Sequence, residues 1–134
     1  MNLKLQIVGN EKVLFEMPLA LIDWPREQLE DELSTLTEDF QRFSGIFTAL
    51  SNETRLMMMK LLVEEENKVV SFTDFMRDLD LNPKLVRDNA KKLSESGLVE
   101  KVGRGKYRCS KSGEPSFIMI SFALKRLMMT LDEL

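Results

Sequence analysis

The chain has 134 residues, of which 43% are hydrophobic and 31% are charged, and its formal net charge at pH 7 is −3. A chain of this length predicts one domain with a real core and leaves no room for a separate catalytic domain. One cysteine and no histidine exclude an intramolecular disulfide framework, a His/Cys metal cluster and Ser-His or Cys-His catalysis within one chain, so we expect neither an enzyme nor a bound metal or cofactor.

The first segment predicts a β-hairpin. Residues 3–8 and 13–17 are rich in β-forming side chains, and apolar residues alternate with polar ones at Leu3, Leu5 and Ile7. An isolated two-stranded hairpin is marginal in water, so we expect its apolar face to pack on the body of the protein or on a partner subunit.

A helix is predicted to follow Trp24-Pro25 and to run to about residue 50. Its apolar residues recur at spacings of four and three, which is a heptad seam made of Leu29, Leu33, Leu36, Phe40, Phe43, Phe47 and Leu50. We expect a bend or break at Ser44-Gly45. The seam can either pack on the chain's own core or form a contact between subunits. The sequence leaves both alternatives open, and each can hold at a different end of the seam.

The next helix is predicted to start with a cap at Ser51-Asn52-Glu53 and to carry apolar residues as far as Val63. Several of these are methionines. Because unbranched thioethers fill irregular gaps in cores, we assign them to the core and not to a ligand pocket.

The order of elements from Ser71 to Ser110 is typical of a helix-turn-helix followed by a wing. Ser71 with Asp74 fits a capping box at the start of the first helix. Asn82 is predicted to cap the second helix, which has Pro83 at its first position. This second helix is predicted over about residues 83–96, with an inward stripe made of Val86, Ala90 and Leu93.

Gly97 is predicted to end this helix as a left-handed cap, and the wing is predicted over about residues 98–109. Its turn contains Arg104 between two glycines. Alternation along the second wing strand places Tyr107 and Cys109 on the packed face, so Cys109 is expected to be a small buried hydrophobe and not a reactive thiol.

A last helix is predicted from about Glu114, with a second heptad seam made of Phe117, Ile120, Leu124, Leu127, Leu131 and Leu134. Other apolar residues lie outside this seam, and a small monomer has little material to cover them, which predicts a homodimer. The residues that we expect at the dimer contact are Leu29, Leu33, Leu36, Phe40, Phe117, Ile120, Leu124, Leu127, Met128 and Leu131.

The predicted fold is therefore mainly α with small β-hairpins, an α+β winged helix-turn-helix with an N-terminal β-hairpin and long flanking helices. Within one compact domain we expect three segments. They are the hairpin and linker (1–25), the winged helix-turn-helix with its leading helix (26–112) and a C-terminal dimerisation helix (113–134).

The charge is divided unevenly along the chain. Residues 1–83 carry a net charge of −8, residues 84–111 carry +6 and residues 112–134 carry −1. The basic charge therefore coincides with the second helix and the wing, which is where a winged helix-turn-helix faces the phosphates of DNA.

Two motifs resemble those of the ArsR-like winged-helix transcriptional regulators. They are Ala49-Leu50-Ser51-Asn52-Glu53-Thr54-Arg55-Leu56 and Leu93-Ser94-Glu95-Ser96-Gly97-Leu98-Val99, and the resemblance covers about residues 46–112. It implies a homodimer on a near-palindromic operator, with the second helix in the major groove and the wing on the backbone or minor groove. The chain lacks the cysteine and histidine ligands with which founding members sense metals, so we expect no metal sensing.

The positions that we expect to face DNA are Asn82, Lys84, Leu85, Arg87, Asp88, Asn89, Lys91, Lys92, Arg104, Lys106 and Arg108. Arg87 can reach guanine bidentately, and Asn89 can read adenine if it faces the bases. Arg104 can reach into a narrow minor groove, and the lysines can neutralise phosphates. Asp88 either accepts from a cytosine amino group, orients Arg87 or Lys92, or weakens DNA binding.

The leading interpretation is a dimeric, sequence-specific DNA-binding transcriptional regulator. The alternative is a winged-helix module for protein–protein assembly without specific DNA binding. An unknown small-molecule effector is conceivable between the N-terminal elements and the last helix. No apolar stretch approaches the roughly 20 residues of a membrane span, and the N-terminus lacks the features of a signal peptide, so we expect a cytoplasmic protein without a membrane partner.

Overall fold

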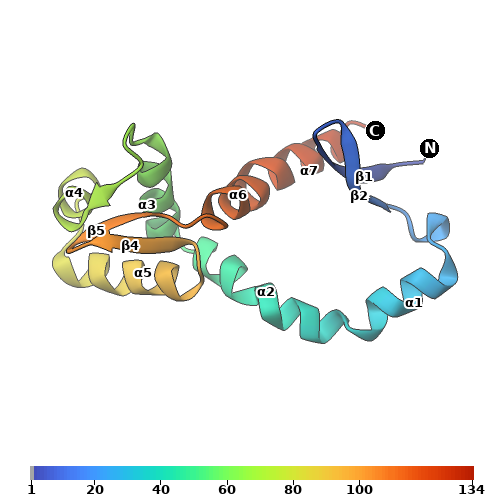
Figure 1. Cartoon of the computed structure of the whole chain (residues 1–134), viewed down its shortest axis with the longest axis horizontal. Coiled ribbons are helices and arrows are strands. Elements are labelled where there is room, and N and C mark those ends of the chain that lie inside the picture. The colour runs from blue at the N-terminus through green and yellow to red at the C-terminus, as the bar shows by residue number, and fades with distance from the viewer. Residues whose placement is uncertain (1) are drawn as a thin grey trace. The chain divides into compact units, whose positions relative to one another are not determined.

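The structure is a computed structural model that describes residues 2–134. Its elements in chain order are β1 (Lys4–Gly9), β2 (Lys12–Pro18), a 3-10 turn (Leu21–Asp23), α1 (Arg26–Ser34), α2 (Leu36–Leu50), α3 (Glu53–Glu64), β3 (Val70–Ser71), α4 (Phe72–Asp78), α5 (Pro83–Glu95), β4 (Val99–Gly103), β5 (Lys106–Cys109), α6 (Gly113–Ile118), a π-helical turn (Met119–Ala123) and α7 (Leu124–Asp132) (Figure 1).

The contacts within the chain group it into two compact units, residues 1–42 and residues 43–134. The segment boundaries predicted at residues 25 and 112 stay predictions. Across residues 2–134, no helix is long and apolar enough to span a membrane.

The predicted N-terminal hairpin is confirmed as the antiparallel pair β1–β2. Leu5 lies opposite Met17 and Ile7 opposite Phe15, so one face of the hairpin is apolar, as the alternation predicts. The other face carries Glu16, which accepts a hydrogen bond of 2.7 Å from Gln6 Nε2. The elements of the N-terminal unit do not cover this apolar face, since Ile7 retains 52% of its accessible surface.

The leading helix is divided at Thr35, and the break predicted as an alternative at Ser44-Gly45 is wrong, because α2 runs unbroken through both residues. A bend there stays a prediction. Local hydrogen bonds explain the division at Thr35. The Ser34 hydroxyl donates to the Asp31 carbonyl at 2.7 Å, and the Thr35 hydroxyl donates to the Asp39 carboxylate at 2.7 Å. Such side-chain bonds compete with the helical ladder, so the predicted seam is split between α1 and α2.

The second unit contains a winged helix-turn-helix, which confirms the predicted fold class. α3, β3, α4, α5, β4 and β5 follow one another in the chain, and the three strands form one antiparallel sheet in the order β3-β5-β4. Figure 1 shows the β4–β5 hairpin lying along α5, with α3 and α4 in the same body. β3 is only two residues long, yet it pairs Val70 with Tyr107 and so anchors the wing to the helices.

The hydrophobic core lies in this unit and joins the end of α2, the helices α3, α4 and α5, the sheet and α6. Its members are Ala49, Leu50, Met58, Met59, Leu62, Val70, Phe75, Val86, Ala90, Leu93, Leu98, Val99 and Phe117. Met58 and Met59 are fully buried, so the assignment of the α3 methionines to the core is confirmed for these two, whereas Met57 is 40% exposed.

The helix starts predicted from the sequence are confirmed by their hydrogen bonds. The side chains of Asn52, Ser71 and Asn82 each accept from a backbone N–H three residues later, at 3.0, 3.0 and 2.8 Å. Gly97 follows α5 with φ +81°, the left-handed conformation predicted for a C-terminal cap.

The last helix is not one regular α-helix. A π-helical turn over Met119–Ala123 separates α6 from α7, although the three segments form one continuous coil in Figure 1. The wider turn brings residues five apart onto one face, and Phe117 and Phe122 accordingly make an edge-on contact with ring centroids 5.5 Å apart. The predicted seam from Phe117 to Leu134 therefore does not continue through this point, because the heptad count assumes α geometry throughout.

Candidate nucleic-acid interface

The second helix of the motif, α5, has a buried face and a charged face. Val86, Ala90 and Leu93 are 0%, 3% and 0% exposed, which confirms the predicted inward stripe. The charged residues of the first three turns are exposed, and they are Lys84, Arg87, Asp88, Lys91 and Lys92. Leu85 is 43% exposed beside them. A helix with this division presents its cations to solvent while its apolar stripe holds it on the body.

The wing repeats this division on β5. Lys106 and Arg108 are exposed, while Tyr107 and Cys109 pack against the core, as predicted. The rings of Phe75 and Tyr107 lie 6.1 Å apart, which ties the wing to α4. Arg104 is exposed at the turn, and Gly105 after it has φ +64°, a conformation that favours glycine.

Ion pairs separate the cations of this surface into two groups. Arg108 pairs with Glu100 across the wing at 2.6 Å, and Lys91 pairs with Glu95 along α5 at 3.9 Å. Within residues 2–134, no ion pair involves the remaining cations, which are Lys84, Arg87, Lys92, Arg104 and Lys106. These five cations, which we call the unpaired cations, are available to an anionic ligand without first breaking an internal ion pair.

The described residues give Asp88 no ion pair with Arg87 or Lys92. Asp88 shares an outward stripe of α5 with Lys84, Lys91 and Glu95, at spacings of four, three and four residues. The outward stripe is thus mixed in charge, and the excess of cations lies on its flanks and on the wing.

Two predicted DNA-facing residues have other roles inside the chain. The side-chain Oδ1 of Asn82 accepts from the backbone N–H of Leu85 and so caps α5. Asn89 is only 7% exposed, its Nδ2 donates to the Leu85 carbonyl at 2.8 Å and its Oδ1 accepts from Arg55 at 3.0 Å. The condition for reading adenine, that Asn89 faces outward, is not met, so its assignment to the DNA-facing set is corrected.

The partner of Asn89, Arg55, is a residue that the sequence reasoning missed. Arg55 is 6% exposed, and its guanidinium also donates to the carbonyls of Ala49 at 2.7 Å and Thr48 at 3.2 Å. A signal was present for Asn89, since it lies three residues after Val86 and four before Leu93 and so falls on the inward stripe. No comparable spacing marks the long-range contact to Arg55.

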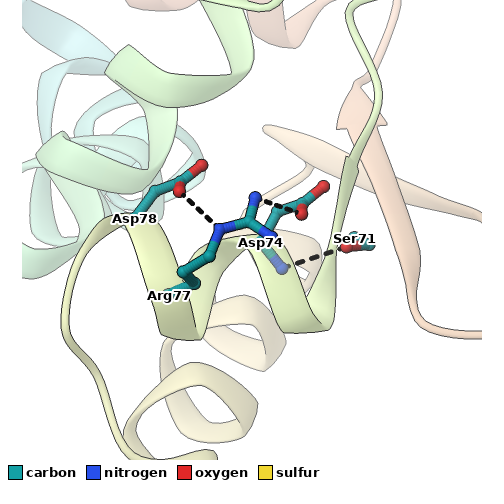
Figure 2. A network of polar contacts seen from close by, with 4 residues as sticks. All are labelled: Ser71, Asp74, Arg77 and Asp78. Carbon is teal, nitrogen blue, oxygen red and sulfur yellow. Dashed lines mark hydrogen bonds and ion pairs between the residues drawn. The ribbon is translucent and has the colours of Figure 1, made fainter.

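The first helix of the motif, α4, carries a small polar network (Figure 2). Arg77 lies between two carboxylates, with Nη2 2.7 Å from Asp74 and Nε 3.0 Å from Asp78. The side-chain hydrogen bond with Ser71 is the largest cause that lowers the pKa of Asp74 below 3.8, and Arg77 lowers it further. Hydrogen bonding to Asp78 is the largest cause that raises the pKa of Arg77. Because Arg77 pairs with two acidic residues, α4 contributes no net positive charge here.

Cys109 borders a cavity of about 480 Å³ between α3, β5 and α6, whose other lining residues include Val63, Lys68 and Glu114. Burial is the largest cause that raises the pKa of the Cys109 thiol, and Glu114 raises it further. A thiol held in its protonated form is a poor nucleophile, which agrees with the packing role predicted for it. The part of the chain that the structure describes contains no group of three or more potential metal ligands.

The predicted dimer residues fall into a buried and an exposed group. Phe117 is 5% exposed in the chain's own core, so its assignment to the dimer contact is corrected. Ile120 packs against that core but is half-buried, and its assignment stays a prediction. The exposed members retain between 46% and 61% of their accessible surface, and they are Leu33, Leu36, Phe40, Leu124 and Met128. Leu29, Leu127 and Leu131 are half-buried.

The topology and the two-faced α5 and β5 define this part of the chain as a winged helix-turn-helix with a cationic surface. No protein-family model matches the chain, and no curated protein matches it. Among solved structures, it is similar to the transcriptional repressor BigR from Xylella fastidiosa, with a TM-score of 0.47 and 20% sequence identity over 73% of this chain and 97% of that chain. A likeness of this size says nothing about what this chain binds.

Proposed function

We propose that the protein is a dimeric, sequence-specific DNA-binding transcriptional regulator. In this proposal α5 enters the major groove and the β4–β5 wing contacts the backbone or the minor groove. The observation that carries the proposal is the set of unpaired cations, which occurs on the two elements that a winged helix-turn-helix presents to DNA. The net negative charge of the chain does not oppose this function, since nearly all of the acidic excess precedes residue 84.

The unpaired cations have different proposed roles. Arg87 lies in the first half of α5, the part of a recognition helix that contacts base edges, and its planar fork suits guanine. Lys84, Lys92 and Lys106 are point charges suited to phosphates, which sets affinity and salt dependence but not sequence choice. Arg104 projects from a turn flanked by two glycines, where no neighbouring side chain blocks its reach to a narrow minor groove.

The paired or engaged residues have lesser roles in the proposal. Lys91 and Arg108 can contribute only by exchanging a carboxylate partner for a phosphate, and Asn82 acts by capping the helix. Asp88 is proposed to accept from a cytosine amino group, because no ion pair holds it to Arg87 or Lys92. Leu85 is exposed next to these residues and offers an apolar contact for a thymine methyl group.

Dimerisation is part of the proposal because the flanking helices expose apolar side chains in rows. On α7, Leu124 and Met128 are 46% and 52% exposed at a spacing of four residues. On α1 and α2, Leu33, Leu36 and Phe40 are each more than half exposed. Such rows on a chain of this size favour a second copy as their cover, and two copies would hold two α5 helices for the two halves of an operator. The ArsR-like resemblance, a cytoplasmic location and an effector stay predictions.

Selection of bound sequences from random double-stranded DNA, repeated at several salt concentrations, tests the proposal. We expect enrichment of a two-fold symmetric site and an affinity that falls steeply with salt. Arg87→Ala should relax the preference at one base position in each half-site and weaken specific binding by about 1–3 kcal/mol. The matched control Lys92→Ala should weaken binding to all sequences alike and lower the salt slope by about 1 per subunit. Absence of enrichment, or an affinity that ignores salt, would refute the proposal.

A second candidate function is protein–protein assembly through the same fold. The mixed outward stripe of α5, in which Asp88 and Glu95 alternate with lysines, favours it, since such a stripe suits a partner surface of mixed charge. The double variant Arg87→Ala/Arg104→Ala separates the two functions. If the cellular role of the protein survives that variant, assembly replaces DNA binding as the better explanation.

A further inference from the structure

Arg55 and Asn89 are the two buried polar side chains among the residues that the structure describes, and they are bonded to each other. Arg55 has no carboxylate partner in that part of the chain. Burial of a guanidinium without a counter-ion costs free energy, so packing alone does not account for the position of Arg55.

The charge of Arg55 is compensated by the end of a helix. Nε and Nη2 donate to the carbonyls of Ala49 and Thr48, which belong to the last turn of α2. Carbonyls of a last turn lack helical partners and carry the negative end of the helix dipole, which favours a cation. Arg55 therefore holds the C-terminal end of α2 with two donors and keeps Nη1 for Asn89.

Asn89 occupies the one polar place on the inner face of α5. Its neighbours on that face, Val86, Ala90 and Leu93, are apolar and buried. Apolar packing is non-directional and allows a helix to rotate or slide by small amounts, whereas a hydrogen bond requires a fixed direction and distance. The 3.0 Å bond from Arg55 to Asn89 is thus a directional contact between the inner face of α5 and the first turn of α3, and the same guanidinium also holds the end of α2.

We propose that Arg55 and Asn89 are positioning residues that fix the rotation of α5 on the body, and with it the direction in which Arg87 projects. This inference rests on the proposed function, because the direction of Arg87 matters only if α5 reads DNA. It predicts that loss of the Arg55–Asn89 bond lowers discrimination between DNA sequences while leaving the number of phosphate contacts unchanged.

Two substitutions of Asn89 separate its two hydrogen bonds. Asn89→Ser keeps a hydroxyl that can donate to the Leu85 carbonyl four residues earlier, but its side chain is too short to reach Arg55. Asn89→Asp keeps an oxygen acceptor for Arg55 at the same place, but it removes the donor to Leu85. The measurement is the ratio of specific to non-specific DNA affinity at one salt concentration, together with the salt slope and the thermal midpoint of each variant.

We expect Asn89→Ser to lower that ratio about tenfold with an unchanged salt slope, and Asn89→Asp to retain it within about threefold. A ratio equal to that of the wild type in both variants would overturn the inference, even if both melt at lower temperatures, because a purely structural role changes stability alone. If Asn89→Ser does not fold, Arg55→Lys replaces it, since lysine keeps the charge and loses the guanidinium fork, and an unchanged ratio there is equally decisive.

Failure of the proposed function gives a different result. If the wild-type protein enriches no sequence, there is no specific binding for either variant to lose, and the proposed function falls together with this inference. If the wild type selects a site and Asn89→Ser selects it equally well, only the inference falls.

Discussion

The winged helix and the segments that flank it differ in how far their apolar residues are buried. The buried apolar residues found in the structure all lie between Ala49 and Phe117. In the flanks, which are residues 2–48 and 118–134, Ile7, Phe40 and Met128 are 52%, 61% and 52% exposed. The winged helix therefore buries its apolar residues within its own unit, while the apolar residues of the flanks are not covered by the elements next to them in the chain.

The two β-hairpins show the same difference on a smaller scale. Both alternate apolar and polar residues, and both pair antiparallel. The β4–β5 hairpin is extended by β3 into a three-stranded sheet, and its Tyr107 packs against the core. The β1–β2 hairpin has only two strands, and Phe15 on its apolar face is 41% exposed. Alternation thus determines which residues share a face, but neighbouring elements determine whether that face is buried.

The largest test of this comparison is a pair of Phe→Ala substitutions. Phe75→Ala in the winged helix removes a ring that is 1% exposed, so we expect the free energy of unfolding to fall by about 3–5 kcal/mol. Phe15→Ala in the N-terminal hairpin should cost about 1 kcal/mol or less at concentrations where the protein is a monomer. Urea unfolding followed by circular dichroism measures both. Equal losses would show that the flanks are stabilised within one chain as strongly as the winged helix.

A smaller effect is expected when a charge is placed on α7. If the exposed apolar row of α7 is covered by a second copy, Met128→Glu buries a carboxylate in that contact and should weaken the dimer about 100-fold, or about 2.7 kcal/mol. Sedimentation equilibrium measures the dissociation constant, and circular dichroism should show an intact winged helix. The control is Arg126→Glu, an exposed charged position two residues from both Leu124 and Met128 and so on the other side of α7, which should change the constant little. If the wild-type protein sediments as a monomer, the proposal that a second copy covers the apolar row of α7 is wrong.

The features that were predictable from the sequence are those that depend on local contacts. Asn52, Ser71 and Asn82 cap helices by bonding N–H groups three residues away, and Gly97 adopts a left-handed conformation at a helix end. Each is decided within a few residues, so a short pattern contains the needed information.

Features that depend on distant residues or on small energy differences were not predictable in this way. The bond between Arg55 and Asn89 joins residues 34 apart in the chain, and no spacing rule connects them. The π turn after Ile118 changes the period of the helix itself, so a seam counted with a fixed period could not reveal it. For the candidate site, periodicity and charge predicted which cations of α5 and β5 face outward. Only the structure shows which of these cations form ion pairs.

The smallest test uses two glycines, one on each side of the comparison, for which the same substitution should have opposite signs. Gly97 ends α5 with φ +81°, and an added Cβ would meet no atom within 4 Å, so only backbone strain opposes Gly97→Ala. We expect it to cost about 1 kcal/mol, because alanine disfavours the left-handed region. Gly45 lies inside α2 in the N-terminal flank with equally open space around its Cβ position, so Gly45→Ala should stabilise the helix by about 0.5–1 kcal/mol. Thermal unfolding of the two variants measures both changes. If Gly45→Ala lowers the midpoint instead, the space beside its Cβ position is occupied in the folded protein, and the contrast with Gly97 fails.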